Sequence, residues 1–143
     1  IAIAVFLFPI AEELLKFLCA KFIPKFAFGT IISYAVFEFA FVKMPHFDRE
    51  LGMYNLDILL FSIASMIFHI GTAYAYLENR LRNYHFLTFI VMVSLHIFYN
   101  YLSEVDMPRI MSFIVYAISC LLPFIYLRAT KLFISNDGAT AAS

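Results

Sequence analysis

Charged side chains are scarce in this chain of 143 residues, and the two signs cancel. Ten Lys and Arg residues balance ten Asp and Glu residues, and charged residues make up 14% of the sequence. Proteins that hold nucleic acid carry a clustered basic surface, which such a balance does not supply. The composition therefore excludes nucleic acid as an expected partner.

Cysteine is also rare, because only Cys19 and Cys120 occur, far apart and both in apolar stretches. They form no C-x-x-C pair, which excludes a dithiol redox motif and a cysteine-rich zinc site. Free cysteine is commonly a small buried filler, and we expect that role for both. No basic segment precedes the apolar run at 1–5, so a signal peptide is not indicated, and we expect the chain to be the core of a longer protein.

Apolar residues, in contrast, are abundant. They make up 64% of the chain, aromatic residues make up 19%, and the mean hydropathy is +0.87. Soluble domains are typically about 45–50% apolar, so this excess indicates lipid as the solvent. Runs near the length of about 20 residues that a membrane helix needs occur five times, at 1–22, 26–42, 57–77, 86–102 and 110–133. Continuous runs favour helices, since membrane strands are shorter and alternate.

The sequence therefore predicts an all-α, polytopic integral membrane helix bundle with about five transmembrane helices. Without an internal repeat or a linker, it predicts one transmembrane domain at 1–134 and a polar, disordered tail at 135–143. Cytoplasmic loops of membrane proteins are enriched in Lys and Arg. The side reached after the first, third and fifth runs holds Lys21, Lys25, Arg80, Arg82, Arg128 and Lys131. This asymmetry predicts a cytoplasmic carboxyl end. We expect the membrane to be the plasma membrane of a prokaryote.

Several ionisable or strongly polar residues fall deep inside these runs. An ionisable group at bilayer depth costs at least a few kcal/mol, so it requires a partner and usually serves a function. The residues are Glu12, Glu13, Glu38, His69, His96 and Asn100. Because successive spans run in opposite directions, all six can meet in one layer of the bundle. Lys16 lies three or four residues after the glutamate pair and can neutralise one of them.

This inventory suits a catalytic metal. Two histidines and one glutamate are a common ligand set for a divalent ion with an open position for water. We therefore expect Glu38, His69 and His96 to bind a divalent metal, preferably Zn²⁺. A further carboxylate can act as general base on the water. Asn100 can hydrogen-bond a developing oxyanion or complete the metal shell.

Four short motifs resemble those of the PrsW-type intramembrane proteases, which are related to the CAAX prenyl proteases and the bacteriocin-processing enzymes. Residues 12–16 (EELLK) resemble the E-E-x-x-K motif, and residues 34–38 (YAVFE) resemble an aromatic followed four residues later by glutamate. Residues 69–73 (HIGTA) and 96–100 (HIFYN) resemble the third motif and the fourth, H-x-x-x-N. Lys16 and Glu38 stand where the CAAX branch has Arg and His, which favours the PrsW branch, although Tyr34 replaces the usual phenylalanine.

The resemblance implies a metal-dependent endopeptidase that cleaves a membrane-anchored protein or peptide substrate within or near the lipid bilayer. By analogy with the wider group, Glu12 would activate water, and Glu13 would pair with Lys16 or support the site from behind. Two other functions remain open. A small ion or proton transporter subunit would also place carboxylates and histidines at the midplane, although this chain lacks the Gly/Pro interruptions common at transporter sites. A structural subunit could also retain such motifs without activity.

Overall fold

The computed structural model describes residues 3–37, 54–78, 84–105 and 107–140. In these ranges all the regular secondary structure is helical, so the all-α prediction is confirmed. The elements, in chain order, are η1 (Ile3–Leu7, a π-helical turn), α1 (Phe8–Phe22), α2 (Pro24–Phe37), α3 (Tyr54–Leu77), α4 (His85–Glu104), α5 (Arg109–Ser119) and α6 (Leu122–Thr140).

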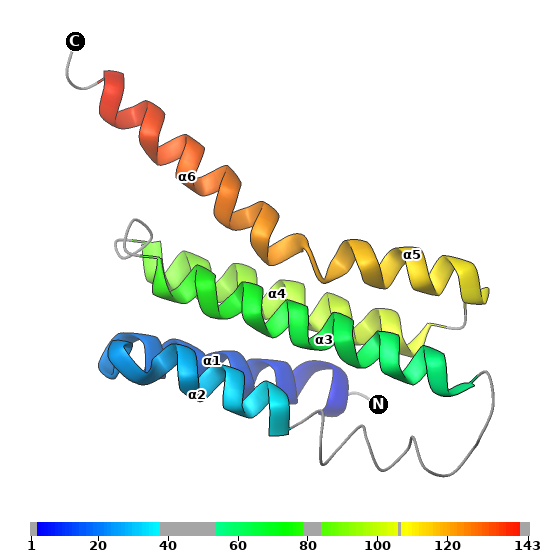
Figure 1. Ribbon diagram of the computed structural model, residues 1–143. Coiled ribbons are helices and arrows are strands. Elements are labelled where there is room, and N and C mark those ends of the chain that lie inside the picture. Colours follow the sequence, from blue (N-terminus) through cyan, green and yellow to red (C-terminus); the bar gives the residue numbers. More distant parts are fainter. Residues whose placement is uncertain (1–2, 38–53, 79–83, 106, 141–143) are drawn as a thin grey trace.

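The helices form three layers (Figure 1). Helices α1 and α2 make one outer layer, α3 and α4 the middle layer, and α5 and α6 the other outer layer. Helix α3 packs against α1, α2, α4, α5 and α6, which makes it the centre of the bundle. Polar side chains on α3 can therefore contact partners from every layer.

A single residue separates α1 from α2. Ile23 leaves the helical conformation, and its N–H still donates to the Cys19 carbonyl at 2.9 Å. Pro24 then begins α2, where the missing N–H of proline removes no hydrogen bond because the first turn of a helix has no internal acceptor for it. The expected break between the runs at 1–22 and 26–42 is thus confirmed.

The apolar run expected as one helix over 110–133 is in fact two helices. Helix α5 ends at Ser119 and α6 begins at Leu122, with a turn at Cys120 and Leu121. Pro123 is the physical reason, because its ring clashes with the preceding turn and it cannot donate to the carbonyl four residues earlier. The Leu121 N–H instead donates to the Ile118 carbonyl at 3.0 Å, a tighter turn than an α-helix makes.

The expected polar tail also differs from what the structure shows. Helix α6 continues as far as Thr140, and in Figure 1 it extends away from the bundle. Continuing a helix is inexpensive once it exists, because each added residue gains one backbone hydrogen bond. The part of the tail at 141–143 lies outside the described residues.

Small residues let α3 approach its neighbours closely. Gly71 and Ala75 are buried on α3, one turn apart. A Cβ atom added at Gly71 would lie 2.8 Å from a Phe124 ring carbon and 2.9 Å from Pro123 Cβ. The absence of a side chain at Gly71 therefore admits a neighbouring helix, and that helix is α6.

Two apolar clusters lie along the bundle, one toward each end. The first contains Ala20, Ala27, Ala75, Tyr76 and Met92, and the second contains Ala64, Phe68, Tyr99, Tyr116 and Cys120. Between these clusters, α3 and α4 carry buried polar residues, including His69, Thr72 and His96. The polar layer is thus enclosed by apolar packing on both sides.

The outward surface is rich in large apolar side chains. Exposed examples from four helices are Phe26, Phe86, Ile110 and Leu132. Within the described residues, two stretches are long and apolar enough to cross a membrane, His85–Leu102 and Ile110–Leu132. Only 22% of each stretch is buried inside the molecule. Core helices of soluble proteins are mostly buried, so these two stretches present their apolar side chains outward instead.

Candidate metal centre

The polar layer gathers ionisable side chains from three helices. Helix α1 contributes Glu12, Glu13 and Lys16, α3 contributes His69, and α4 contributes His96. Four of the five are buried, and Glu12 is only 13% exposed. Taking a charge out of water costs several kcal/mol per ion unless other groups compensate it. The contacts within the layer therefore decide what it can do.

Three of these side chains direct potential ligand atoms at one another. One such atom from each of Glu12, His69 and His96 lies within 4.8 Å of the other two. Glu12 Oε1 lies 3.1 Å from His69 Nδ1, and Glu12 Oε2 lies 3.9 Å from His96 Nε2. Ligands that share one zinc ion each lie about 2.0–2.2 Å from it, which puts them about 3–4 Å from one another. The group is therefore already close to the spacing that a single ion requires.

Glu13 is fully buried, and both of its oxygens are engaged. Oε1 accepts hydrogen bonds from Lys16 Nζ at 2.6 Å and from His96 Nδ1 at 2.9 Å. Oε2 accepts one from the Tyr76 hydroxyl at 3.0 Å. This carboxylate thus ties α1 to α3 and α4. The predicted pairing of Glu13 with Lys16 is confirmed.

Lys16 is the buried cation of the layer. Its ammonium donates to Glu13, to His69 Nδ1 at 2.7 Å and to Thr72 Oγ1 at 3.4 Å, and it lies 2.9 Å from Glu12 Oε1. It therefore contacts both glutamates, although the sequence predicted that it would neutralise one. The pair carries two negative charges and Lys16 one positive charge, so a net negative charge remains when the histidines are neutral.

A divalent metal fits this arrangement by three observations. The residues offer one carboxylate and two imidazoles, the donor types that zinc prefers. Glu12 Oε1 is buried without a hydrogen bond, although it lies 2.9 Å from Lys16 Nζ and 3.1 Å from His69 Nδ1. The Nδ1–H of His96 donates to Glu13, which turns Nε2 toward Glu12. Metal-binding histidines are commonly held by such a carboxylate. An ion here requires Lys16 to withdraw from Glu12 and His69 while it keeps Glu13.

The structure brings together most of the residues that the sequence singled out. His69 and His96 converge as predicted, with ring centroids 5.5 Å apart. Tyr34, from the second motif, packs edge-on against His69 at 6.3 Å. Asn100 is half-buried one turn after His96 on α4. Glu38 lies outside the described residues, so its ligand role stays a prediction.

The arrangement gives Glu12 contacts that suit a metal ligand, and its role as general base stays a prediction. The sequence, read by analogy, gave Glu12 the role of general base and Glu38 that of ligand. In the structure Glu12 is the carboxylate that stands with both histidines. The cause lies in α1, where Glu12 and Glu13 are adjacent and so point in directions about 100° apart. Glu13 faces Tyr76, which leaves Glu12 toward the two rings.

Sequence reasoning missed Tyr76 as a member of this site. Its hydroxyl supports Glu13, yet tyrosine is frequent in the chain, so its presence at one more position did not single it out. The spacing on α3 carried a signal, because Ser65, His69, Thr72 and Tyr76 recur every three or four residues and share one helix face. A polar stripe of this kind within an apolar helix indicates a buried interaction.

Comparison with protein family models, with curated protein sequences and with solved structures found no match to this chain. The likeness to the PrsW-type proteases therefore rests on the four motifs alone.

Proposed function

We propose that the chain is a polytopic membrane protein with about five transmembrane helices. The two apolar stretches that face outward support this, and so do the exposed aromatic and aliphatic side chains on the other helices. In water such a surface would be a large uncompensated apolar patch, whereas in lipid it matches the solvent. The fully engaged Glu13 is also what low dielectric demands of a buried carboxylate.

Within this bundle we propose a metal-dependent endopeptidase that cleaves a membrane-anchored protein substrate in or near the bilayer. One observation carries the proposal: Glu12, His69 and His96 present ligand atoms within 4.8 Å of one another, and Glu12 Oε1 is buried there without a hydrogen bond. Four motifs in the order found in the PrsW-type proteases point to the same chemistry.

Each side chain then has a distinct task. Glu12, His69 and His96 hold the ion, preferably zinc, which would supply Lewis-acid activation of water and of the peptide carbonyl. Glu13 fixes the ring of His96 through the Nδ1–H, and Tyr76 and Lys16 fix Glu13. Asn100, one turn beyond His96, is placed on α4 to donate a hydrogen bond to the oxyanion that develops on the substrate.

The general base follows from the same assignment. Glu13 is fully buried and is held by hydrogen bonds to Lys16, Tyr76 and His96, whereas Glu12 is used as a ligand. We therefore assign the base to Glu38, which exchanges its predicted role with Glu12. The two assignments make opposite predictions for the metal content of the Glu12→Gln and Glu38→Gln variants.

The test combines metal analysis with cleavage of a single-span substrate by purified protein reconstituted in vesicles. We expect wild type to bind about one zinc ion per chain, and His69→Ala, His96→Ala and Glu12→Gln to lose it, because each removes a ligand. Glu38→Gln should keep the ion and cleave about 10²–10⁴-fold more slowly. His85→Ala is the matched control, since His85 lies outside the ligand group and should retain both properties.

Two results would overturn parts of the proposal. Retention of zinc by Glu12→Gln together with its loss from Glu38→Gln would restore the original assignment. Wild type that neither binds a divalent metal nor cleaves a peptide would favour a small ion or proton transporter, or an inactive structural subunit.

A further inference from the structure

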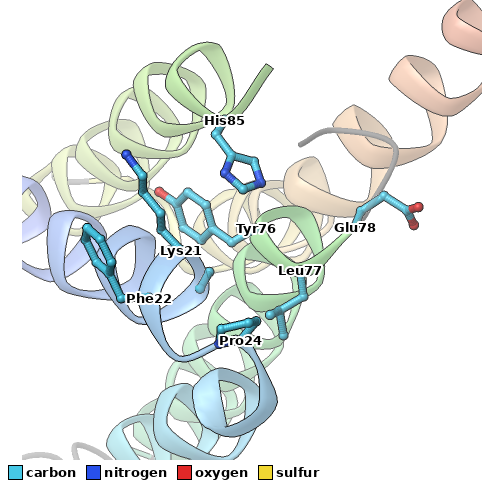
Figure 2. Close-up of a pocket in the computed structure, with 8 residues that line it drawn as sticks. Lys21, Phe22, Pro24, Tyr76, Leu77, Glu78 and His85 are labelled. Atoms are coloured by element: carbon cyan, nitrogen blue, oxygen red, sulfur yellow. The ribbon is translucent and has the colours of Figure 1, made fainter. Parts of the chain in front are cut away.

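A pocket of about 440 Å³ opens at one end of the bundle (Figure 2). It lies where α1 ends, α2 begins, α3 ends and α4 begins. The lining residues are Ala20, Lys21, Phe22, Pro24, Tyr76, Leu77, Glu78 and His85. The volume falls within the range of about 300–1,000 Å³ that is typical of sites for small ligands. The lining is mixed, with apolar walls and a few polar groups.

Three of the polar groups are arranged around one ring. The Phe17 ring packs edge-on against Tyr76 and His85, with centroids 6.3 and 6.2 Å away. The Lys21 ammonium lies 5.8 Å from the same ring centroid and 5.6 Å from that of Phe22. These contacts hold the lysine against aromatic faces while its side chain stays exposed. The pocket therefore has a cation at a defined place.

The charges around the pocket leave this cation in excess. Glu78 forms an ion pair with Lys131 of α6, so its carboxylate is already neutralised. Figure 2 shows the Glu78 side chain extending away from Tyr76 and His85. Within the described residues, Lys21 contacts aromatic rings and forms no ion pair. The pocket is consequently suited to an anion.

The position of the pocket along the bundle identifies the source of that anion. His85, in its wall, is also the first residue of a candidate membrane-spanning stretch. If the bundle spans a bilayer, the pocket lies at the level where hydrocarbon gives way to headgroups. It also lies at the end where the sequence gathers Lys and Arg, the end expected to face the anionic inner leaflet.

We propose that this pocket binds the phosphate headgroup of an anionic phospholipid, with Lys21 as its principal contact. The proposal rests on the proposed membrane embedding and not on proteolysis. Phe22, Pro24 and Leu77 can pack against the glycerol and upper acyl chain, while the ammonium faces the phosphate. Basic pockets between membrane helices commonly hold lipid headgroups in this way.

A bound lipid would also support the metal centre. Tyr76 belongs to both sites, because it lines the pocket and its hydroxyl donates a hydrogen bond to Glu13. A headgroup that fixes Tyr76 would therefore fix the carboxylate that holds His96. This contact joins the lipid site to the ligand group through two side chains.

The test measures thermal unfolding of the detergent-purified full chain with added short-chain phosphatidylglycerol, phosphatidylcholine or inorganic phosphate. We expect phosphatidylglycerol to raise the melting temperature more than phosphatidylcholine does. Lys21→Gln should weaken the apparent binding of phosphatidylglycerol about fivefold, because this is the loss in affinity expected when one basic side chain near an anionic lipid is neutralised. Lys25→Gln is the matched control, because Lys25 is an exposed lysine four residues away that does not line the pocket. Lys21→Arg, which keeps the charge, should restore binding.

Equal responses to the two lipids, or equal losses in Lys21→Gln and Lys25→Gln, would overturn the proposal. An equal shift with inorganic phosphate alone would show a free-anion site and would also overturn the lipid assignment. Protein that stays monodisperse without detergent and ignores lipid would instead contradict the membrane embedding. Zinc binding, measured on the same samples, reports separately on the metal centre.

Discussion

At the scale of single residues, the polar layer shows how one buried carboxylate organises several neighbours. Glu13 accepts hydrogen bonds from Lys16, His96 and Tyr76, which lie on three different helices. Each donor lowers the cost of keeping the charge away from water, and each is held in place in return. Removing any one of them should therefore disturb the others. Two predictions follow from this coupling.

The Tyr76 hydroxyl should contribute measurably to stability. Tyr76→Phe keeps the ring but leaves Glu13 Oε2 without its donor, which typically costs about 1–3 kcal/mol for a buried group. We expect a lower melting temperature in detergent. Tyr74→Phe is the control, since Tyr74 is exposed on the same helix and packs its ring against Phe28. Equal melting temperatures for the two variants would contradict the hydrogen bond.

Glu13→Gln should weaken metal binding without abolishing it. The amide can still accept a hydrogen bond from His96 but no longer carries the charge that favours it. Loss of such a supporting carboxylate typically costs about 10–100-fold in metal affinity. The measurement is competition for zinc against a chromophoric chelator, with His96→Ala as the reference for loss of a ligand. An affinity equal to that of wild type would remove Glu13 from its supporting role.

At the scale of helices, the packing of α3 against α6 depends on one missing side chain. Gly71→Ala would place its Cβ 2.8 Å from Phe124 and 2.9 Å from Pro123, so α6 must move outward. Overpacking of this kind typically costs about 1–3 kcal/mol. We expect a lower melting temperature and poorer retention of the folded state in detergent.

Gly29→Ala is the matched control for that substitution. Gly29 lies on α2, and an added Cβ there would meet nothing within 4 Å. Alanine favours a helix over glycine by about 1 kcal/mol, so this variant should be neutral or more stable. If both alanine variants behaved alike, close α3–α6 contact would not be the reason for a glycine at position 71.

At the scale of the whole molecule, several charged side chains from different helices lie at the same end of the bundle. The pocket places Lys21, Glu78 and His85 at one end, and the ion pair between Glu78 and Lys131 brings the basic part of α6 to that end. The loop asymmetry in the sequence assumes that successive spans run in opposite directions, which would bring these residues to the same end. The structure thus supports a shared end for these charges, and the side of the membrane remains a prediction.

Accessibility labelling can decide that orientation. In a background with Cys19 and Cys120 replaced by alanine, we expect a single cysteine at Arg80 to react only from the cytoplasmic side. A single cysteine at Asp48 should react only from the opposite side, because the Lys and Arg excess lies on the first side. Labelling of both positions from the same side would contradict the assignment of spans.

The composition and the apolar runs by themselves determined the helical class and most helix positions. They did so because helix formation in an apolar run is a local property, set by run length and by breakers such as Pro24. The same reasoning failed at 110–133, where Pro123 lies within the apolar run and gave no change in hydropathy. The two histidines were identified for a similar reason, since any ionisable residue at that depth requires a partner.

Only the tertiary structure decided which carboxylate stands with the histidines. Glu12 and Glu13 are adjacent, and the sequence cannot say which of them faces Tyr76 and which faces His69, because this depends on how far α1 is rotated about its axis. The burial of Tyr76 against Glu13 fixes that rotation and turns Glu12 toward His69 and His96. The pocket lined by Lys21, Tyr76 and His85 likewise exists only where the ends of four helices meet, so no single segment of the sequence predicts it.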